Sequence, residues 1–501
     1  FLKEDALTYY NFLAQEVDIT GSDKREFFNV MRNDDGSVDV AVRKIKKEGD
    51  LGDTIYSRKF FSKETHELRL YAMGGEDSIT VNGDGGPIKV RIIGGRDKDQ
   101  FINNSKAARG KTVVYDFKPE GNTISGNKVK NELSGSSAVN RYDRRTFQYD
   151  LLKPGLAFAY NRDDGVFLGI GLRYTSHGFR KDPYKIMQQV SAQHALATRA
   201  FMYTYKLELI DMIGKTDILV NGNMRLPRNT INFFGYGNET KYDPDNGKGI
   251  NYYRTRFDHV DVNSLLRTSL TPDVSVEYGP SFQYFHYKPT DNEGRIINDS
   301  DLPGLDTISL FQEKTYLGPK LRINIDNRND LVLPSRGVRW VTDLEYFNGL
   351  NKYSTNFTRL NSDMAIYISS NNPAKLVIAL RFGGGINFGD FEYYQAQYLS
   401  GTQNLRGYRK YRFAGDKMLY SNVELRYKIK DFRTYLFPGT VGVFAFHDVG
   451  RVWYKEEVSK TWHRGYGGGI WLAPAKKIVA TGFIAFSKEG AMPQFSIGYQ
   501  F

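Results

Sequence analysis

The chain has 501 residues, with 69 lysines and arginines against 57 aspartates and glutamates, a net charge of +12, and no cysteine. The lack of cysteine excludes a disulfide scaffold and a cysteine-ligated zinc protein, while the dispersed positive charge permits anionic partners. Tyrosine and phenylalanine number 34 and 33, although no apolar run reaches the roughly 18 residues of a membrane-spanning helix. A closed barrel of amphipathic strands remains as a way to cross a membrane with a polar average composition.

Residues 1–120 are predicted to form a small, mostly β domain. Two segments, DALTYYNFLAQEV (5–17) and SDKREFFNVMR (22–32), are predicted to be helical. Five short strands separated by Gly and Asp turns follow them, at 37–45, 53–60, 67–73, 77–83 and 89–95.

Two stretches in this domain resemble a calcium-binding nonapeptide repeat: GGRDKDQFI (94–102) and the shorter GGEDSITV (74–81). Because only two degenerate copies are present, they indicate ordinary strand turns rather than a calcium-filled roll. The following segment, 121–150, is polar and rich in Gly and Ser, and we predict that it is a linker.

From residue 151 to 501 the dominant signal is alternation of apolar and polar side chains. In DKMLYSNVELRYKIK (416–430), one face carries leucine, valine and tyrosine while the other carries Glu424, Arg426 and Lys428. The pattern predicts sixteen strands, at 154–161, 165–177, 187–197, 200–212, 215–227, 251–270, 273–288, 315–327, 336–348, 355–370, 373–386, 417–429, 438–448, 464–473, 478–487 and 494–501. Strands of this length suit a tilted crossing of a bilayer, so we predict a sixteen-stranded antiparallel transmembrane β-barrel with a polar lumen.

The connections between these strands alternate between short turns and often long loops. In membrane barrels the short turns lie on the periplasmic side. The start of the first strand, the end of the last strand and the N-terminal domain are therefore expected in the periplasm of a Gram-negative bacterium. The chain starts at Phe1 without a signal peptide, as expected of a mature or truncated product.

Enzyme signatures are missing from the sequence. It contains no HExxH, no phosphate-binding loop and no GxSxG motif, and its seven histidines are scattered without metal-ligand spacing. We therefore expect no catalytic residues, no metal and no cofactor.

The C-terminal segment QFSIGYQF is an amphipathic strand that ends on an aromatic residue. Its apolar face is formed by Phe495, Ile497, Tyr499 and Phe501. Such an ending resembles the signal by which the outer-membrane assembly machinery recognises barrel substrates.

The segment NLRGYRKYRF (404–413) interleaves four cations with three aromatic side chains, which by itself would suit single-stranded nucleic acid. In its context it instead resembles the BamA/TamA outer-membrane assembly family, also called the bacterial surface antigen family, over about residues 150–501. The family's loop tetrapeptide corresponds to Leu405, Arg406, Gly407 and Tyr408. Its companion motifs correspond to Glu424 and to Phe446, Asp448 and Gly450, and NFFGYGNET (232–240) matches a further motif in a form common among Bacteroidota relatives.

Alternation also places Glu424 and Asp448 on inward faces of neighbouring strands. A long loop folded back into the lumen would bring Arg406 to both carboxylates, where a guanidinium fork suits such a clamp. Gly407 would permit close backbone approach and Tyr408 would wedge against the wall. Arg409, Lys410 and Arg412 are expected to be solvated loop charges that can face the acidic lumen wall.

The resemblance implies a barrel that assists insertion or translocation of proteins at the outer membrane. It also implies a weak seam between the first and last strands that opens sideways to template a client strand. Expected partners are outer-membrane lipids, client outer-membrane or secreted proteins and accessory lipoproteins, with no role for nucleic acid. Family members usually carry polypeptide-transport-associated (POTRA) repeats, and residues 1–145 lack the β-α-α-β-β pattern of these repeats. The alternative function is therefore a secretion pore or membrane anchor for an upstream domain, such as a phosphoesterase; a passive porin is a third possibility.

Overall fold

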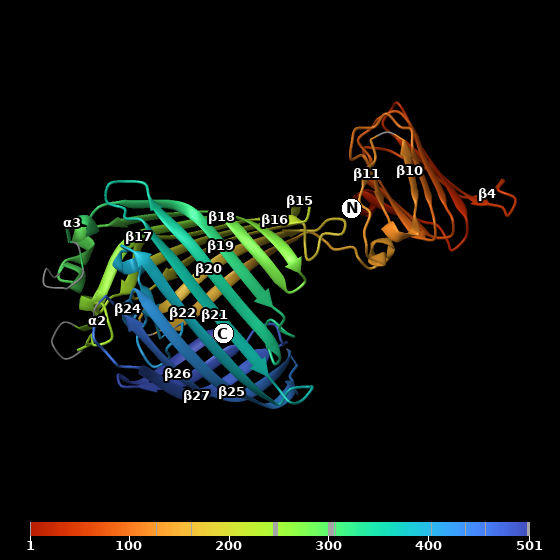
Figure 1. Ribbon diagram of the computed structural model, residues 1–501. Coiled ribbons are helices and arrows are strands. Elements are labelled where there is room, and N and C mark those ends of the chain that lie inside the picture. Colours follow the sequence, from red (N-terminus) through yellow and green to blue (C-terminus); the bar gives the residue numbers. More distant parts are fainter. Residues whose placement is uncertain are drawn as a thin grey trace. The chain divides into compact units, whose positions relative to one another are not determined.

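The computed structural model describes residues 2–126, 128–161, 163–243, 249–298, 305, 307–401, 403–435, 437–455 and 457–497. It divides into two compact units, residues 1–147 and 148–501, here called unit 1 and unit 2 (Figure 1). Within the ranges just given, every helix is too short or too polar to span a membrane.

Unit 1 begins with helix α1 (Leu2–Ala14), as predicted, and continues as two sheets. The first sheet has the order β1 (Glu16–Thr20), β5 (Glu67–Gly74), β7 (Lys89–Arg96), β9 (Thr112–Tyr115) and β11 (Lys130–Asn131). The second has the order β10 (Thr123–Gly126), β8 (Gln100–Asn103), β6 (Ser78–Gly83), β2 (Glu26–Arg32), β3 (Val38–Ile45) and β4 (Leu51–Phe60). Single turns of 3₁₀-helix lie at η1 (Lys118–Glu120) and η2 (Ser137–Asn140).

From β5 onward the chain of unit 1 alternates between the two sheets, and each strand pairs in parallel with the strand two elements later. Glu67 pairs with Lys89 and Ser78 with Gln100, a step of 22 residues in both sheets. This is the geometry of a parallel β-solenoid, in which each coil contacts only its neighbours. Both sheets contribute to one core of buried aliphatic and aromatic side chains.

The two segments that resemble calcium nonapeptides are corners of successive coils. The backbone N–H of Asp77 donates to Asp99 Oδ1 at 2.9 Å, and that of Asp99 donates to Asn122 Oδ1 at 2.8 Å, which makes a ladder of side chains up the corner. Burial raises the pKa of Asp77 to about 9 and that of Asp99 to about 7. The ladder therefore joins coils through hydrogen bonds to carboxyl groups whose protonated form is favoured by burial.

Two expectations for this region differ from the structure. The segment 22–32 contains strand β2 and no helix, because Glu26, Phe28, Val30 and Arg32 are all buried at period two and pair with β3 and β6. The segment 121–150 was expected to be a linker, but it contains β10 and β11, which pair as the last coil of unit 1. The contact division between the units falls after residue 147.

Unit 2 is a single antiparallel sheet of sixteen strands in sequence order, which confirms the predicted number and architecture (Figure 1). The strands are β12 (Leu151–Asn161), β13 (Gly165–Ser176), β14 (Ile186–Ala195), β15 (Ala200–Ile213), β16 (Thr216–Asn232), β17 (Arg254–Thr271), β18 (Val274–Tyr287), β19 (Lys314–Asp326), β20 (Gly337–Gly349), β21 (Phe357–Ile368), β22 (Leu376–Gly389), β25 (Lys417–Arg433), β26 (Pro438–Trp453), β27 (His463–Pro474), β28 (Ala480–Ser487) and β29 (Gly490–Ile497). The remaining elements lie in its connections: α2 (Gly249–Tyr253), η3 (Pro289–Asn292), η4 (Ile296–Asn298), α3 (Thr307–Leu310), η5 (Tyr393–Gln395), β23 (Gln397–Leu399) and β24 (Phe413–Gly415).

Because consecutive strands are antiparallel, their connections alternate between two ends of the barrel. We call the end at which β12 begins the near end and the opposite one the far end. The long connections 233–253, 288–313, 390–416 and 454–462 all lie at the far end. Side chains of one face are exposed and apolar, as for Leu419 and Leu425, whereas the alternate ones, such as Glu424 and Arg426, are buried inside.

The seam of the barrel lies between β12 and β29, which are neighbours in space. All other neighbouring strands are joined by backbone ladders, but in the described part of the chain no ladder joins β12 to β29. In the described residues, the facing edges of the first and last strands are therefore not joined by backbone pairing, and such edges are open to pairing with another strand.

Candidate functional site: the loop between β22 and β25

The connection 390–416 is folded into the barrel, and most of its described residues from 397 to 415 are buried. Strands β23 and β24 form a small hairpin in which Gln397, Tyr398 and Leu399 pair with Gly415, Ala414 and Phe413. The segment 400–412 forms the tip of this hairpin, and we call it the lumen loop. The hairpin fixes the two ends of the lumen loop, so that its side chains are presented to the barrel wall at defined positions.

Arg406 lies between two carboxylates that belong to neighbouring strands. Its Nε and Nη2 donate to Asp448 Oδ2 and Oδ1, both at 2.8 Å, and its Nη1 donates to Glu424 Oε2 at 2.5 Å. Arg406 is 2% exposed, Glu424 1% and Asp448 0%. A buried, bidentate pair of this kind is among the strongest polar contacts in proteins once every donor is satisfied.

The remaining surfaces of this ion pair are also occupied. The guanidinium carbon of Arg406 lies 3.6 Å from the centre of the Phe446 ring, a cation–π contact in a dry environment. The second oxygen of Glu424, Oε1, accepts a hydrogen bond from Arg426 Nε at 2.7 Å. The motif residues therefore form one network across β25 and β26.

Close backbone approach explains three glycines around the lumen loop. Gly407 has a φ of +90°, which favours glycine, and its carbonyl accepts a hydrogen bond from Ser487 Oγ at 2.5 Å. A Cβ on Gly465 would lie 1.8 Å from the Arg406 carbonyl oxygen, and one on Gly450 would lie 3.0 Å from Leu399. Bulkier residues at these positions would push the loop off the wall.

Leu405 and Tyr408 contribute to an apolar cluster beneath the loop. The other buried members of the cluster are Leu399, Phe413, Tyr420 and Val452. The Tyr408 ring makes edge-on contacts with the rings of Phe413 and His463, with centroids 5.4 and 5.8 Å apart. Apolar burial thus holds the two residues that flank Arg406 and Gly407.

The expectation that Arg409, Lys410 and Arg412 are solvated was wrong, because each has a carboxylate partner. Arg409 Nη1 donates to Asp163 Oδ1 at 3.0 Å, and Lys410 Nζ donates to Asp164 Oδ2 at 2.9 Å. Arg412 forms an ion pair with Glu489 and stacks against Phe234 and Phe413. Arg409 and Arg412 are only 6% and 3% exposed.

The partners of these three cations were missed by sequence reasoning. Asp163 and Asp164 lie in the turn between β12 and β13, and Glu489 lies in the turn between β28 and β29. These are the tips of the two hairpins that border the seam. The sequence feature that could have predicted these partners is a carboxylate in each short turn. Carboxylates are too common in turns to identify a site by themselves.

The segment 232–240, which carries the further family-like motif, packs against the lumen loop and its hairpin. The Asn232 side-chain amide donates to the Lys410 carbonyl oxygen at 3.0 Å, and the Gly237 N–H donates to the Ala414 carbonyl at 2.8 Å. Asn238 Nδ2 donates to the Val452 carbonyl at 2.6 Å. This second loop therefore covers the first and ties it to β26.

Of the predicted C-terminal signal, Phe495 and Ile497 lie on β29 with exposed side chains. Tyr499 and Phe501 lie outside the described residues. In the part of the chain that the structure describes, no three His, Asp or Glu side chains gather in a metal-binding cluster.

A model of the Omp85 superfamily domain matches residues 168–480, and a search of curated protein sequences gives no match. Among solved structures, BamA from Haemophilus ducreyi lacking POTRA domains 1–3 aligns with 12% identity and a TM-score of 0.50, covering 70% of each chain. CdiB from Acinetobacter baumannii aligns with 12% identity and a TM-score of 0.43, covering 70% of this chain and 59% of that one. For CdiB from Escherichia coli the values are 11% and 0.44, with 69% and 61% covered.

The likeness to BamA shows a shared fold, and the family match extends from β13 to β28. Because the periplasmic unit 1 is continuous in sequence with the start of β12, the near end of the barrel is periplasmic and the far end faces the cell exterior. The chain thus belongs to the Omp85 superfamily, with its barrel in the outer membrane of a Gram-negative bacterium and its first unit in the periplasm.

Proposed function

We propose that this protein assists the insertion or translocation of other proteins at the outer membrane, and that the seam between β12 and β29 is its working part. The observation that carries this proposal is that these strands are adjacent without a backbone ladder in the described residues. An unpaired strand edge is unfavourable in lipid, because its N–H and C=O groups lack partners. A client strand can satisfy those groups by pairing with the edge.

The lumen loop provides a means of controlling the seam. On one side Arg409 and Lys410 contact the β12–β13 turn, and on the other Arg412 contacts the β28–β29 turn. Arg406 meanwhile anchors the same loop to β25 and β26. In this proposal the loop holds both edge hairpins at the outer end of the seam, and separating β12 from β29 requires at least one of these ion pairs to break.

An engineered disulfide across the seam tests the proposal. The chain has no cysteine, so cysteine pairs placed between 152–157 and 492–497 react only with each other. The protein would be reconstituted in liposomes, and insertion of a small eight-stranded barrel would be followed by protease protection. We expect the oxidised protein to lose insertion activity and to regain it after reduction, while single-cysteine controls remain active. Full activity of the crosslinked barrel would exclude a role for seam opening.

A second candidate function is a secretion pore or membrane anchor for an attached domain. It is favoured by unit 1, which is a parallel solenoid with a single α-helix in its described residues and lacks the two-helix pattern of client-receiving repeats. Under this function, a tag fused to unit 1 stays in the outer-membrane fraction and the seam variant inserts no client barrel, whether it is oxidised or reduced. Insertion activity that appears on reduction distinguishes the first function from the second.

A further inference from the structure

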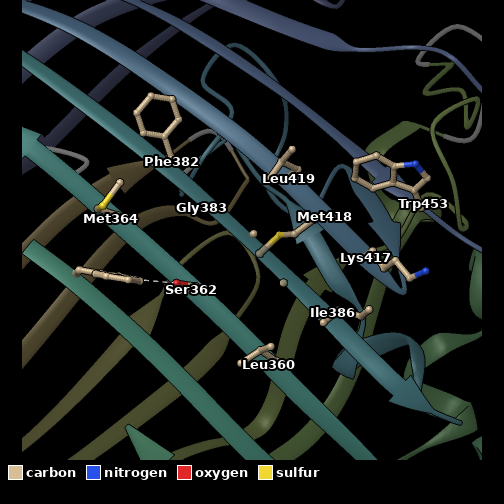
Figure 2. Close-up of a pocket in the computed structure, with 13 residues that line it drawn as sticks. Leu360, Ser362, Met364, Phe382, Gly383, Ile386, Lys417, Met418, Leu419 and Trp453 are labelled. Atoms are coloured by element: carbon tan, nitrogen blue, oxygen red, sulfur yellow. Dashed lines mark hydrogen bonds between the residues drawn. The ribbon is translucent and has the colours of Figure 1, made fainter. Parts of the chain in front are cut away.

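The outer face of the barrel carries an apolar groove that runs across strands β20, β21, β22, β25 and β26 (Figure 2). Its volume is about 720 Å³, and it extends from Trp340 to Trp453. The wall between these tryptophans is formed by Leu360, Met364, Phe382, Ile386 and Leu419. Trp340 donates through Nε1 to Ser362 Oγ at 2.9 Å, which satisfies the polar atoms of both side chains in an otherwise apolar surface.

Strand β22 lines the groove with three consecutive glycines, at 383, 384 and 385. Gly384 points outward and leaves the floor without a side chain. The inward neighbours are constrained differently: a Cβ on Gly383 would lie 2.2 Å from the Tyr420 hydroxyl, and one on Gly385 would lie 2.2 Å from Asn361 Oδ1. Packing inside the barrel therefore accounts for Gly383 and Gly385, whereas an outward Cβ on Gly384 would lie 3.0 Å from the Met418 carbonyl oxygen and would make the groove shallower.

Two cations mark the extracellular end of this groove. Lys417 begins β25 at the far end and lines the groove beside Trp453, as Figure 2 shows. Arg451 pairs across the strands with Leu419 on the same outer face, and its guanidinium lies 4.5 and 5.5 Å from the rings of Trp453 and Trp462. Within the described ranges neither cation has a carboxylate within ion-pair distance, in contrast to the cations of the lumen loop.

We propose that this groove is a binding site for a phosphate-bearing, multiply acylated glycolipid of the outer leaflet. The apolar floor accommodates acyl chains, which avoid water and pack into hollows of a lipid-facing wall. Lys417 and Arg451 sit at the headgroup level, where cations attract lipid phosphates. Trp453 and Trp462, whose rings contact each other, mark the same level, since indole rings favour the boundary between hydrocarbon and headgroups.

Native mass spectrometry of the full chain tests this assignment, with synthetic bisphosphorylated lipid A as the probe and phosphatidylethanolamine as the comparison lipid. We expect one tightly retained lipid A, and we expect Lys417→Glu with Arg451→Glu to weaken its retention about tenfold. Gly384→Phe, which fills the floor, should displace it as well. The matched control is Lys430→Glu, because Lys430 is also exposed but lies at the periplasmic end of the same strand.

A measurement on the wild-type protein makes the result independent of whether the variants fold. Lipid A with a photoactivatable acyl chain should crosslink mainly to peptides of β21, β22 and β25. Crosslinks spread evenly around the barrel, or equal retention of both lipids, would show annular lipid only and would overturn the proposal.

Discussion

Arg406 and Asp448 are joined by three hydrogen bonds, two from the guanidinium and one from the Arg406 backbone N–H, which donates to Asp448 Oδ2 at 2.9 Å. Asp448 therefore fixes both the side chain and the main chain of the loop residue. Arg406→Ala should lower the stability of the folded barrel by about 3–5 kcal/mol, because it leaves the buried Asp448 without its guanidinium partner and removes one of the two arginines that contact Glu424. Arg406→Lys should be nearly as damaging, since an ammonium cannot form the bidentate contact.

These variants can be compared by heat-modifiable gel mobility and by thermal unfolding in detergent. Arg433→Ala is the control, because Arg433 is exposed at the periplasmic end of β25. If Arg406→Ala migrated and melted like the wild type, the ion pair would not support the fold.

The contact of Arg412 with Glu489 predicts a coupling between the lumen loop and the last hairpin. Arg412→Gln and Glu489→Gln should each accelerate amide hydrogen exchange in residues 485–492, and the double variant should add little to either. The reason is that both substitutions remove the same contact. Additive effects of the two substitutions would indicate that the residues act independently.

Two glycines on neighbouring strands form a matched pair for testing loop seating. Gly465→Ala places a methyl group against the Arg406 carbonyl, whereas a Cβ at Gly482 meets nothing within 4 Å. We expect Gly465→Ala to lower the melting temperature and to increase protease cleavage in the lumen loop. Gly482→Ala should leave both quantities unchanged, and an equal effect of the two substitutions would contradict the steric explanation.

The aspartate ladder of unit 1 predicts a stability that falls as pH rises. Burial raises the pKa of Asp77 from 3.8 to about 9, so the folded unit binds its proton more tightly than the unfolded chain does. The stabilisation is complete below about pH 4 and is lost progressively up to about pH 9, with Asp99 and Asp116, whose pKa values burial raises to about 7, acting in the same direction. Asp77→Asn should reduce this dependence, because Asn122 already occupies the equivalent rung of the ladder.

Hydrogen exchange of unit 1 amides in the full chain, measured from pH 5 to pH 9, checks this prediction. Asp53→Asn serves as the control at an exposed carboxylate. An unchanged pH dependence in Asp77→Asn would assign the effect to other groups.

The sixteen strands were predictable from sequence because each has one face toward lipid and one toward a polar lumen, which imposes alternation along the strand. The same alternation in β2 was hidden, because Glu26 and Arg32 occupy buried positions. Arg32 Nη1 donates to the Ile88 carbonyl at 2.9 Å and Nη2 to the Lys111 carbonyl at 3.1 Å. Acceptors that lie on distant coils cannot be inferred from local pattern.

Some contacts of the candidate site could likewise be predicted from the sequence, and others could not. The family-like motif and strand alternation predicted that Arg406 would meet Glu424 and Asp448, since these positions follow from register alone. The contacts of Arg409 and Arg412 depend on how a long loop crosses the barrel interior. Asp163 is 246 positions away from Arg409, and no local signal connects them.

The route of the lumen loop also has a consequence for the order of folding. The loop belongs to the connection between the eleventh and twelfth strands, yet its contacts include the first turn, at Asp163, and the last, at Glu489. Contacts between such distant segments form late, because the chain between them must first be ordered. The loop can reach its final position only when both terminal hairpins are in place, so its seating reports that the barrel is complete.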